Sequence, residues 1–168
     1  MIAHQVIKTI RAGNAVTRWH TRRMHRYETV GEHTANVLSI VYALAGTPSP
    51  ELIGATILHD TAEQWTGDVP ATAKREMPTL KENLDALEDK MMEQNMLHVP
   101  DITDDERVIL KWADMLDLCY TCLDELNMGN RSISEVFDRG IEYLKGLPSH
   151  PIGLKFLEEL VKERKHVG

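Results

Sequence analysis

The stretch "DDERVILKWADMLDLCYTCLDELNMG", residues 104–129, decides the fold class of this chain. It opens with acidic residues, which stabilise a helix N-terminus, and it closes at Gly129, a residue that suits the position after a helix. Between Val108 and Leu123 it is apolar on nearly every side, as expected of a helix that other helices surround. We therefore predict a central helix over residues 104–128.

The rest of the chain is also helical in pattern, and the alternation typical of strands is hard to find. Pro and Gly separate the helical segments in this interpretation. A chain of 168 residues with 42% hydrophobic content can fill one core and is short for two. We predict a compact all-α bundle, one domain over 1–168, whose other helices span 2–13, 31–45, 50–65, 71–77, 79–97, 131–146 and 150–165.

Composition excludes several classes of partner. The net charge of −7 argues against non-specific binding to nucleic acids or anionic membranes. No apolar run reaches the roughly 20 residues that a membrane span needs, and the amino terminus lacks a signal-peptide pattern. We expect no nucleic-acid partner, no membrane and a cytoplasmic location, the host cytoplasm if a phage encodes the chain. Cys119 and Cys122 have Cys-x-x-Cys spacing without a second pair, so two buried helical thiols are expected.

Ionisable residues interrupt the apolar faces of three helices. His33 lies on the apolar stripe of the helix over 31–45, His59 and Asp60 interrupt the next helix, and Asp114 interrupts the central one. A buried carboxylate without a partner is costly. Neighbouring residues on a helix point about 100° apart, so His59 and Asp60 can both lean toward one point between them. His33 and Asp114 could reach that point from two neighbouring helices. Two imidazoles and two carboxylates suit Mn, Fe, Co, Ni or Zn better than Mg or Ca.

Each of these residues also has an ordinary structural interpretation. A single His on an apolar face is more often a hydrogen-bonded core histidine, and adjacent His-Asp pairs are common by chance. Asp117, one turn after Asp114, could replace it in the argument. Spacing alone therefore leaves the metal site as the minority interpretation.

In combination, these residues resemble the HD-domain phosphohydrolases, whose signature is His, then His-Asp, then Asp on separate helices of an α-bundle. "RW" at 18–19, "GEHT" at 31–34, "LHDTAEQWTGDVPATAK" at 58–74 and "KWADMLDLCYTCLDEL" at 111–126 are similar to the YfbR-like 5′-deoxynucleotidases. They are similar at least as much to the phage dATP triphosphohydrolases of the DatZ type. The resemblance covers roughly residues 15–130.

The resemblance implies an HD-domain helical bundle with its metal site between the central helices. The ligands of one divalent transition metal (Zn, Co or Mn) would be His33, His59, Asp60 and Asp114. Catalytic and substrate-binding roles would fall to Glu63 as the acid/base group, Arg18 and Lys74 on phosphate oxygens, and Trp19 against the base or sugar. Asp68 would also bind substrate, although an Asp before a Val-Pro turn can simply cap the next helix.

The expected activity is hydrolysis of a deoxynucleotide. The leading hypothesis is a dATP triphosphohydrolase that releases triphosphate and deoxyadenosine by attack of water on the α-phosphorus. The run "RWHTRRMHR", residues 18–26, favours it because several arginines suit several phosphates, although a solvated loop is an equal explanation. The alternatives are a 5′-deoxynucleotidase acting on monophosphates and a non-catalytic nucleotide-binding bundle.

A homo-oligomer is also expected. Apolar residues near the carboxy terminus could form an interface, or could equally close the core of the chain itself: Leu154, Phe156, Leu157 and Leu160.

Overall fold

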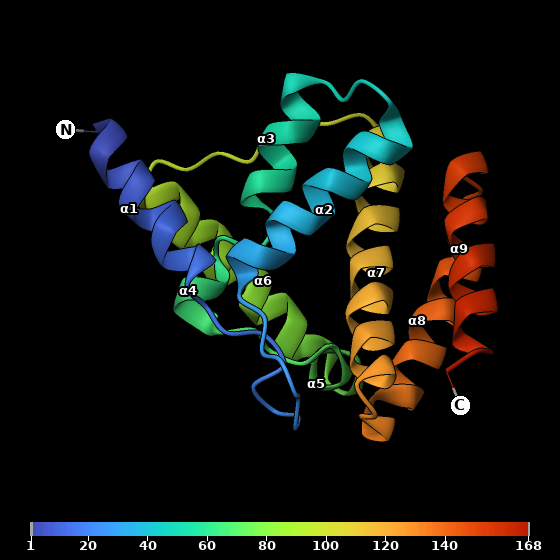
Figure 1. The fold of residues 1–168 in the computed structure, drawn as a ribbon. Coiled ribbons are helices and arrows are strands. Elements are labelled where there is room, and N and C mark those ends of the chain that lie inside the picture. Colours follow the sequence, from blue (N-terminus) through green and yellow to red (C-terminus); the bar gives the residue numbers. More distant parts are fainter. Residues whose placement is uncertain (1, 168) are drawn as a thin grey trace.

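The computed structural model describes residues 2–167, and the regular elements in this range are all helical. An isolated antiparallel bridge between Thr17 and Thr29 is the only β-pairing within it. The all-α prediction is therefore confirmed (Figure 1). The elements are α1 (Ile2–Asn14), α2 (Val30–Ala45), α3 (Pro50–Leu58), α4 (Glu63–Thr66), α5 (Ala71–Glu76), α6 (Pro78–Gln94), α7 (Asp104–Asn127), the 3-10 turn η1 (Arg131–Ile133), α8 (Ser134–Gly146) and α9 (Pro151–Arg164).

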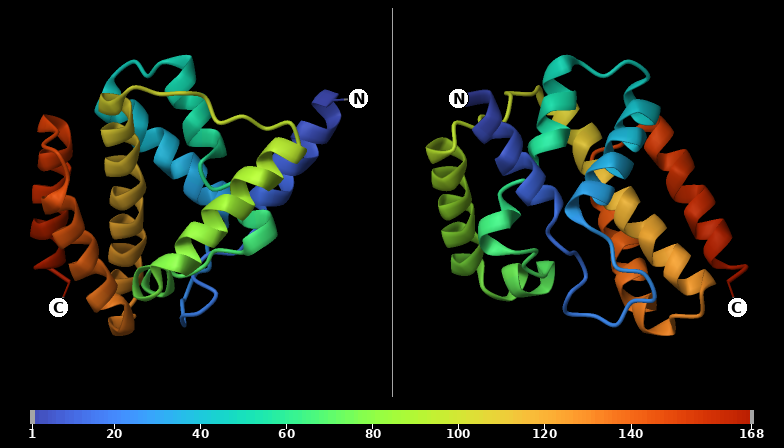
Figure 2. Two further views of the ribbon diagram at one scale, coloured as in Figure 1. Left: turned by 180° about the vertical axis from the view of Figure 1, so that it is seen from behind. Right: turned by 60° about the vertical axis from the view of Figure 1, so that its left-hand side comes forward.

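Helix α7 is the central helix that the sequence predicts. It begins with a capping box, in which Thr103 Oγ1 accepts the N–H of Glu106 and the Glu106 carboxylate accepts the N–H of Thr103. It ends two residues before Gly129, whose φ of 94° is a left-handed conformation that glycine adopts without strain. Helix α2 packs on one side of α7, and α8 and α9 pack on another (Figures 1 and 2). The buried side chains of α7 include Trp112, Ala113, Leu116, Cys119, Cys122, Leu123 and Leu126.

Hydrophobic side chains form one large cluster and one small one. The large cluster joins α2, α3, α7, α8 and α9. The small one centres on Ala62, Met92 and Leu97 and joins α1, α4 and α6, which lie on the far side of α2 from α8 and α9 (Figures 1 and 2). Leu157 and Leu160 belong to the large cluster. The single domain over 1–168 stays a prediction.

The predicted continuous helix over residues 50–65 is wrong at residues 59–62, which form turns between two helices. Helix α3 ends at Leu58, and α4 begins only at Glu63. In between, the N–H of Thr61 bonds to the Leu58 carbonyl and the N–H of Glu63 to the Asp60 carbonyl, which are three-residue turns rather than α-helical bonds. Helix α1 packs here so closely that a Cβ on Gly13 would lie 2.7 Å from the Thr61 carbonyl oxygen. His59 and Asp60 are therefore turn residues at a helix end.

The prediction that glycines only separate helices is also wrong. Gly140 lies inside α8 and Gly153 inside α9, and both helices approach α7 closely. An added Cβ would lie 2.7 Å from Cys119 Sγ at the first position and 2.7 Å from Trp112 Cε3 at the second. These glycines serve helix packing, because a larger residue would not fit against α7.

The two cysteines are free and buried, as predicted. Burial raises the pKa of the Cys119 thiol to about 12, which keeps it protonated and unreactive at neutral pH. Within residues 2–167, no helix is both long enough and apolar enough to cross a membrane.

Candidate metal and phosphate site

His33 lies in the first turn of α2, and its side chain is fully buried. A capping box between Thr29 and Glu32 fixes the start of this helix. His33 Nδ1 lies 2.6 Å from Asp117 Oδ2 of α7. An ionised carboxylate can only accept a hydrogen bond, so Nδ1 carries the proton and Nε2 presents a lone pair.

His59 presents the same nitrogen to the same place. Its Nδ1 lies 2.7 Å from the carbonyl oxygen of Thr56, which also only accepts, so Nδ1 is the protonated atom here too. The Nε2 atoms of His33 and His59 are 3.2 Å apart. Two lone pairs at this distance repel each other, so a positive species, either a proton or a metal ion, is required between them.

Two carboxylates complete the cluster. Asp60 Oδ2 lies 3.3 Å from His59 Nε2 and 3.4 Å from His33 Nε2, and Asp114 Oδ1 lies 3.4 Å from His33 Nε2. The structure therefore brings together all four side chains that the sequence predicts as ligands. Ligand atoms of His33, His59 and Asp60 lie within 4.8 Å of one another. This set of two imidazole nitrogens and two carboxylate oxygens fits a divalent transition metal.

The pKa values of the cluster residues show which protons a bound ion would displace. Burial would lower the pKa of His33, but hydrogen bonds to Asp114 and Asp117 outweigh burial and raise it to about 9. Burial would raise the pKa of Asp60, but the neighbouring His59 lowers it to about 2. Burial would also raise the pKa of Asp114, but the hydrogen bond to His33 and the charges of Lys111, His33 and His59 together lower it. A metal ion would therefore compete with protons on the imidazoles and find the carboxylates ionised.

Two cations contact this cluster. Arg18 is buried, and its Nη1 lies 3.1 Å from Asp60 Oδ2 while its Nε lies 3.3 Å from Glu28 Oε2. Lys111 Nζ lies 2.8 Å from Asp114 Oδ2. Lys74 of α5 has no ion-pair partner among residues 2–167, and its charge only partly opposes the rise in the pKa of Glu63. Such cations suit the oxygens of a phosphate group.

Glu63 is the first residue of α4, and only 7% of it is exposed. Its Oε2 is buried without a hydrogen-bond partner among residues 2–167. Burial and the charges of Asp60 and Asp68 raise its pKa to about 8, against the opposing effect of Arg18 and Lys74. In the metal-free protein, this raised pKa favours the neutral carboxylic acid form of Glu63 near pH 7, a form that can donate a proton.

Trp19 and Asp68, both predicted to bind substrate, are in direct contact with each other. The backbone N–H of Trp19 donates to Asp68 Oδ2 at 3.2 Å, and its indole N–H donates to Glu28 Oε2 at 3.4 Å. Trp19 has a φ of 62°, which is strained for a residue with a side chain. Strain of this kind persists only where surrounding contacts hold it, and it is concentrated at functional sites.

Sequence reasoning missed three residues of this site. It weighed Asp117 only as a substitute for Asp114, whereas Asp117 orients His33. The available signal was that Asp114 and Asp117 are one helical turn apart, so both can face the same site. It gave no role to Lys111, which precedes Asp114 by three residues. It did not single out Glu28, which lies in an irregular loop where no periodicity indicates burial.

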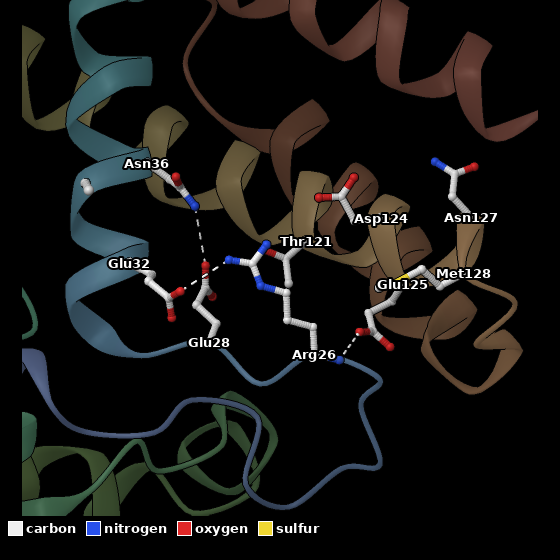
Figure 3. Close-up of a pocket in the computed structure, with 10 residues that line it drawn as sticks. Arg26, Glu28, Glu32, Asn36, Thr121, Asp124, Glu125, Asn127 and Met128 are labelled. Atoms are coloured by element: carbon white, nitrogen blue, oxygen red, sulfur yellow. Dashed lines mark hydrogen bonds and ion pairs between the residues drawn. The ribbon is translucent and has the colours of Figure 1, made fainter.

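A pocket of about 590 Å³ opens beside the site, between α2 and the end of α7 (Figure 3). Its lining contains none of the four predicted metal ligands. Arg26, from the basic run, lies in this pocket and pairs with Glu32 at 3.2 Å with 74% of its side chain exposed. This arginine therefore offsets local acidic charge rather than adding to the cluster of His33 and Asp114.

The fold and the His, His-Asp, Asp cluster define the class of HD-domain proteins. The chain is similar to a solved HD-domain phosphohydrolase of Listeria innocua, with a TM-score of 0.66, 22% identity and coverage of 98% of this chain and 97% of that one. It is also similar to the HD phosphohydrolase DatZ of cyanophage S-2L, solved with dA and one catalytic Zn²⁺ ion. That match has a TM-score of 0.65 and 18% identity, and it covers 95% of each chain.

A family model and curated relatives match this chain. The family model described as 5′-deoxynucleotidase YfbR-like matches residues 5–101. A 5′-deoxynucleotidase of Photobacterium profundum is 30% identical over 149 residues, which are 75% of this chain and 77% of that protein. One of Cronobacter sakazakii is 30% identical over 138 residues, 68% of this chain and 69% of that protein. The chain therefore belongs to the YfbR-like 5′-deoxynucleotidase family, and the resemblance seen in the sequence is confirmed.

Proposed function

We propose that the chain is a metal-dependent phosphohydrolase that removes phosphate from deoxynucleoside 5′-monophosphates. The observation that carries the proposal is the convergence of His33 and His59 Nε2, 3.2 Å apart, with two carboxylates and a buried arginine. Membership of the YfbR-like family supports the monophosphate as substrate. This order reverses the expectation from the sequence, which placed the dATP triphosphohydrolase first.

His33, His59, Asp60 and Asp114 would hold the ion, which we expect to be Zn, Co or Mn. When bound, such an ion polarises a phosphate oxygen and lowers the pKa of a water molecule. Arg18 and Lys74 bind phosphate oxygens and stabilise the charge that develops on them. Trp19 contacts the base or sugar, and Asp68 holds the backbone of Trp19 in place.

Glu63 supplies the proton that the leaving 5′-oxygen needs when the phosphate ester breaks. Burial and the charges of Asp60 and Asp68 raise its pKa to about 8 in the metal-free protein, and burial of this kind suits a general acid. Glu63→Gln has nearly the same shape and cannot give up a proton. We expect this variant to keep its metal and bind nucleotide, but to lose turnover by a factor of about 10² or more. Turnover within a few fold of the wild type would remove Glu63 from the mechanism.

The dATP triphosphohydrolase remains a second candidate because the fold matches DatZ over nearly the whole chain. Product analysis separates the two. Dialysed protein with Mn, Co or Zn is incubated with each deoxynucleoside mono- and triphosphate, and phosphorus NMR identifies the product. Orthophosphate from monophosphates supports the proposal, and triphosphate from dATP supports the second candidate. No product with any metal would favour the non-catalytic nucleotide-binding bundle.

The expected homo-oligomer and cytoplasmic location stay predictions. Leu157 and Leu160 are buried in the core of the chain itself, so they are not free for an interface. Ile152 and Leu154 are each 40% exposed on α9 and remain candidates. Light scattering after size exclusion tests the oligomeric state.

A further inference from the structure

Glu28 has no role in the proposed mechanism, yet its side chain contacts two residues that do. Its Oε2 lies 3.3 Å from Arg18 Nε and 3.4 Å from the indole nitrogen of Trp19. Its Oε1 lies 3.5 Å from Asn36 Nδ2 of α2, a contact drawn in Figure 3. Only 10% of the Glu28 side chain is exposed.

The main chain ties the same residues together. The N–H of Arg18 donates to the Glu28 carbonyl at 2.8 Å, and the N–H of Val30 donates to the Val16 carbonyl at 2.9 Å. These bonds lie on either side of the bridge between Thr17 and Thr29, and together they join the two ends of the loop between α1 and α2. Residue 28 therefore holds residue 18 by its backbone and by its side chain.

Two carboxylates flank the guanidinium of Arg18. Asp60 accepts a hydrogen bond from Nη1 at 3.1 Å, whereas Glu28 lies 3.3 Å from Nε and attracts it by charge without hydrogen-bond geometry. Because a guanidinium is planar, these two contacts restrict the direction of its remaining donors. Over residues 2–167, Arg18 Nη2 donates no hydrogen bond. These donors remain for an oxygen of the substrate.

We propose that Glu28 is a positioning residue that orients Arg18 toward the phosphate group and Trp19 toward the nucleoside of the substrate. The inference rests on the proposed function and deepens it. A buried arginine needs compensating charge. Without Glu28, Asp60 is the remaining ion-pair partner of Arg18 in the described chain, and the guanidinium turns toward this predicted metal ligand and away from the phosphate.

Two substitutions separate the two roles of Glu28. Glu28→Gln removes the negative charge that holds Arg18 but keeps an oxygen that accepts from the Trp19 indole. Glu28→Ala removes both contacts. Asp124→Asn is the matched control. This variant also loses a carboxylate from the same pocket, but the Asp124 side chain makes no hydrogen bond within the described range.

The test measures binding of deoxyadenosine 5′-monophosphate and of deoxyadenosine by calorimetry. EDTA-treated protein is used so that turnover does not interfere. We expect Glu28→Gln to bind the monophosphate about tenfold more weakly and deoxyadenosine within about twofold of the wild type. We expect Glu28→Ala to weaken the binding of both ligands and Asp124→Asn to leave the binding of both unchanged. In the manganese-loaded protein, we expect Glu28→Gln to raise KM and also to lower kcat by more than about threefold, because Arg18 both binds the phosphate and stabilises the charge that develops on it.

Three outcomes overturn the inference. Unchanged monophosphate binding in Glu28→Gln shows that Arg18 needs no positioning by this residue. If Glu28→Gln weakens the binding of both ligands equally and lowers Tm, Glu28 has a merely structural role. In both cases an active wild type leaves the proposed function standing. A wild type that binds neither ligand and hydrolyses no deoxynucleotide overturns the proposed function, and this inference with it.

Discussion

One carboxylate determines which nitrogen of His33 faces the other predicted metal ligands. Asp117 accepts from Nδ1 at 2.6 Å in a buried environment, so the lone pair of His33 stays on Nε2. A histidine that binds a metal is commonly oriented in this way by an acceptor on its other nitrogen. Asp117 therefore contributes to the proposed site without being one of its four ligands.

Asp117→Asn should weaken metal binding while the fold persists. The amide NH₂ of Asn can donate to Nδ1, which favours the tautomer with a proton on Nε2, the atom that would bind the ion. We expect the affinity for Mn or Zn to fall by a factor of about 10–100, as for other changes to such supporting residues. Competition with a chromophoric chelator measures the affinity.

The matched control is Asp124→Asn, on the same helix and away from His33. It should bind metal as the wild type does, and circular dichroism should show the same helical signal for both variants. Wild-type affinity in Asp117→Asn would mean that the tautomer of His33 does not depend on this carboxylate.

The four residues predicted as metal ligands could be singled out in the sequence because polar residues stand out among apolar ones. His33, His59, Asp60 and Asp114 were visible in this way. Glu28 was not, because a loop has no periodicity against which its burial can be recognised. The position of Lys74 relative to Glu63 depends on how α5 packs, which no local pattern encodes.

At the scale of elements, close helix packing shows in two glycines of α8 and α9. Gly153→Ala should destabilise the protein, because its Cβ would lie 2.7 Å from Trp112 Cε3. Trp112 cannot easily move, since it is fully buried and its indole N–H bonds to the Pro148 carbonyl at 2.9 Å. The overpacking cost of about 1–3 kcal/mol exceeds the gain in helix propensity of up to about 1 kcal/mol.

Thermal unfolding tests this prediction against Gly146→Ala as the control. No atom lies within 4 Å of a Cβ added at Gly146, so this variant should be as stable as the wild type or slightly more stable. Equal Tm values for the two variants would show that α9 can shift away from α7 at little cost.

The loop that carries Arg18 and Trp19 is anchored at its tip by Glu125 of α7. The buried Glu125 carboxylate accepts from the backbone N–H of His25 and of Arg26, both at 2.9 Å, and from Asn130 Nδ2 at 2.7 Å. Burial would raise the pKa of Glu125, but these hydrogen bonds outweigh burial and lower it. The ionised form is therefore stabilised by folding.

Glu125→Gln should lower the free energy of unfolding at pH 7 by about 1–3 kcal/mol. Because the folded pKa lies below the unfolded one, the contribution of Glu125 is present above the unfolded pKa and is lost as the pH falls through the folded pKa. Urea unfolding at pH 7, 4 and 3 should therefore show the wild type and the variant converging at the two acidic values, which lie below the unfolded pKa. A constant difference between them would contradict this role for the charge.

The sequence predicted the elements well where caps and apolar stripes mark them, as in α7. It failed at residues 59–62 because their composition suits a helix, and only contact with α1 and the small hydrophobic cluster ends α3 at Leu58. It also missed the helical glycines, since a glycine that permits close packing cannot be distinguished by local pattern from one that ends a helix.

At the scale of the whole molecule, the candidate site lies where the two groups of helices meet. His33 and Asp114 come from α2 and α7 of the large cluster, whereas His59 and Asp60 lie in the turn that leads to α4 and the small cluster. An ion bound by all four residues would cross-link the two groups. Metal binding should therefore stabilise the folded protein as a whole.

Manganese should raise Tm, and the increase should be larger at pH 8 than at pH 6. His33 has a pKa raised to about 9 without metal, so below that pH a bound proton must leave before the ion binds. Affinity should then rise by up to about tenfold per pH unit in this range, for each proton displaced. Differential scanning fluorimetry with EDTA or Mn, at pH 6, 7 and 8, measures the effect. In the control variant Asp60→Asn, manganese should raise Tm little at any of these pH values. A gain in Tm that is the same at pH 6 and pH 8, or that survives in Asp60→Asn, would place the ion elsewhere in the protein.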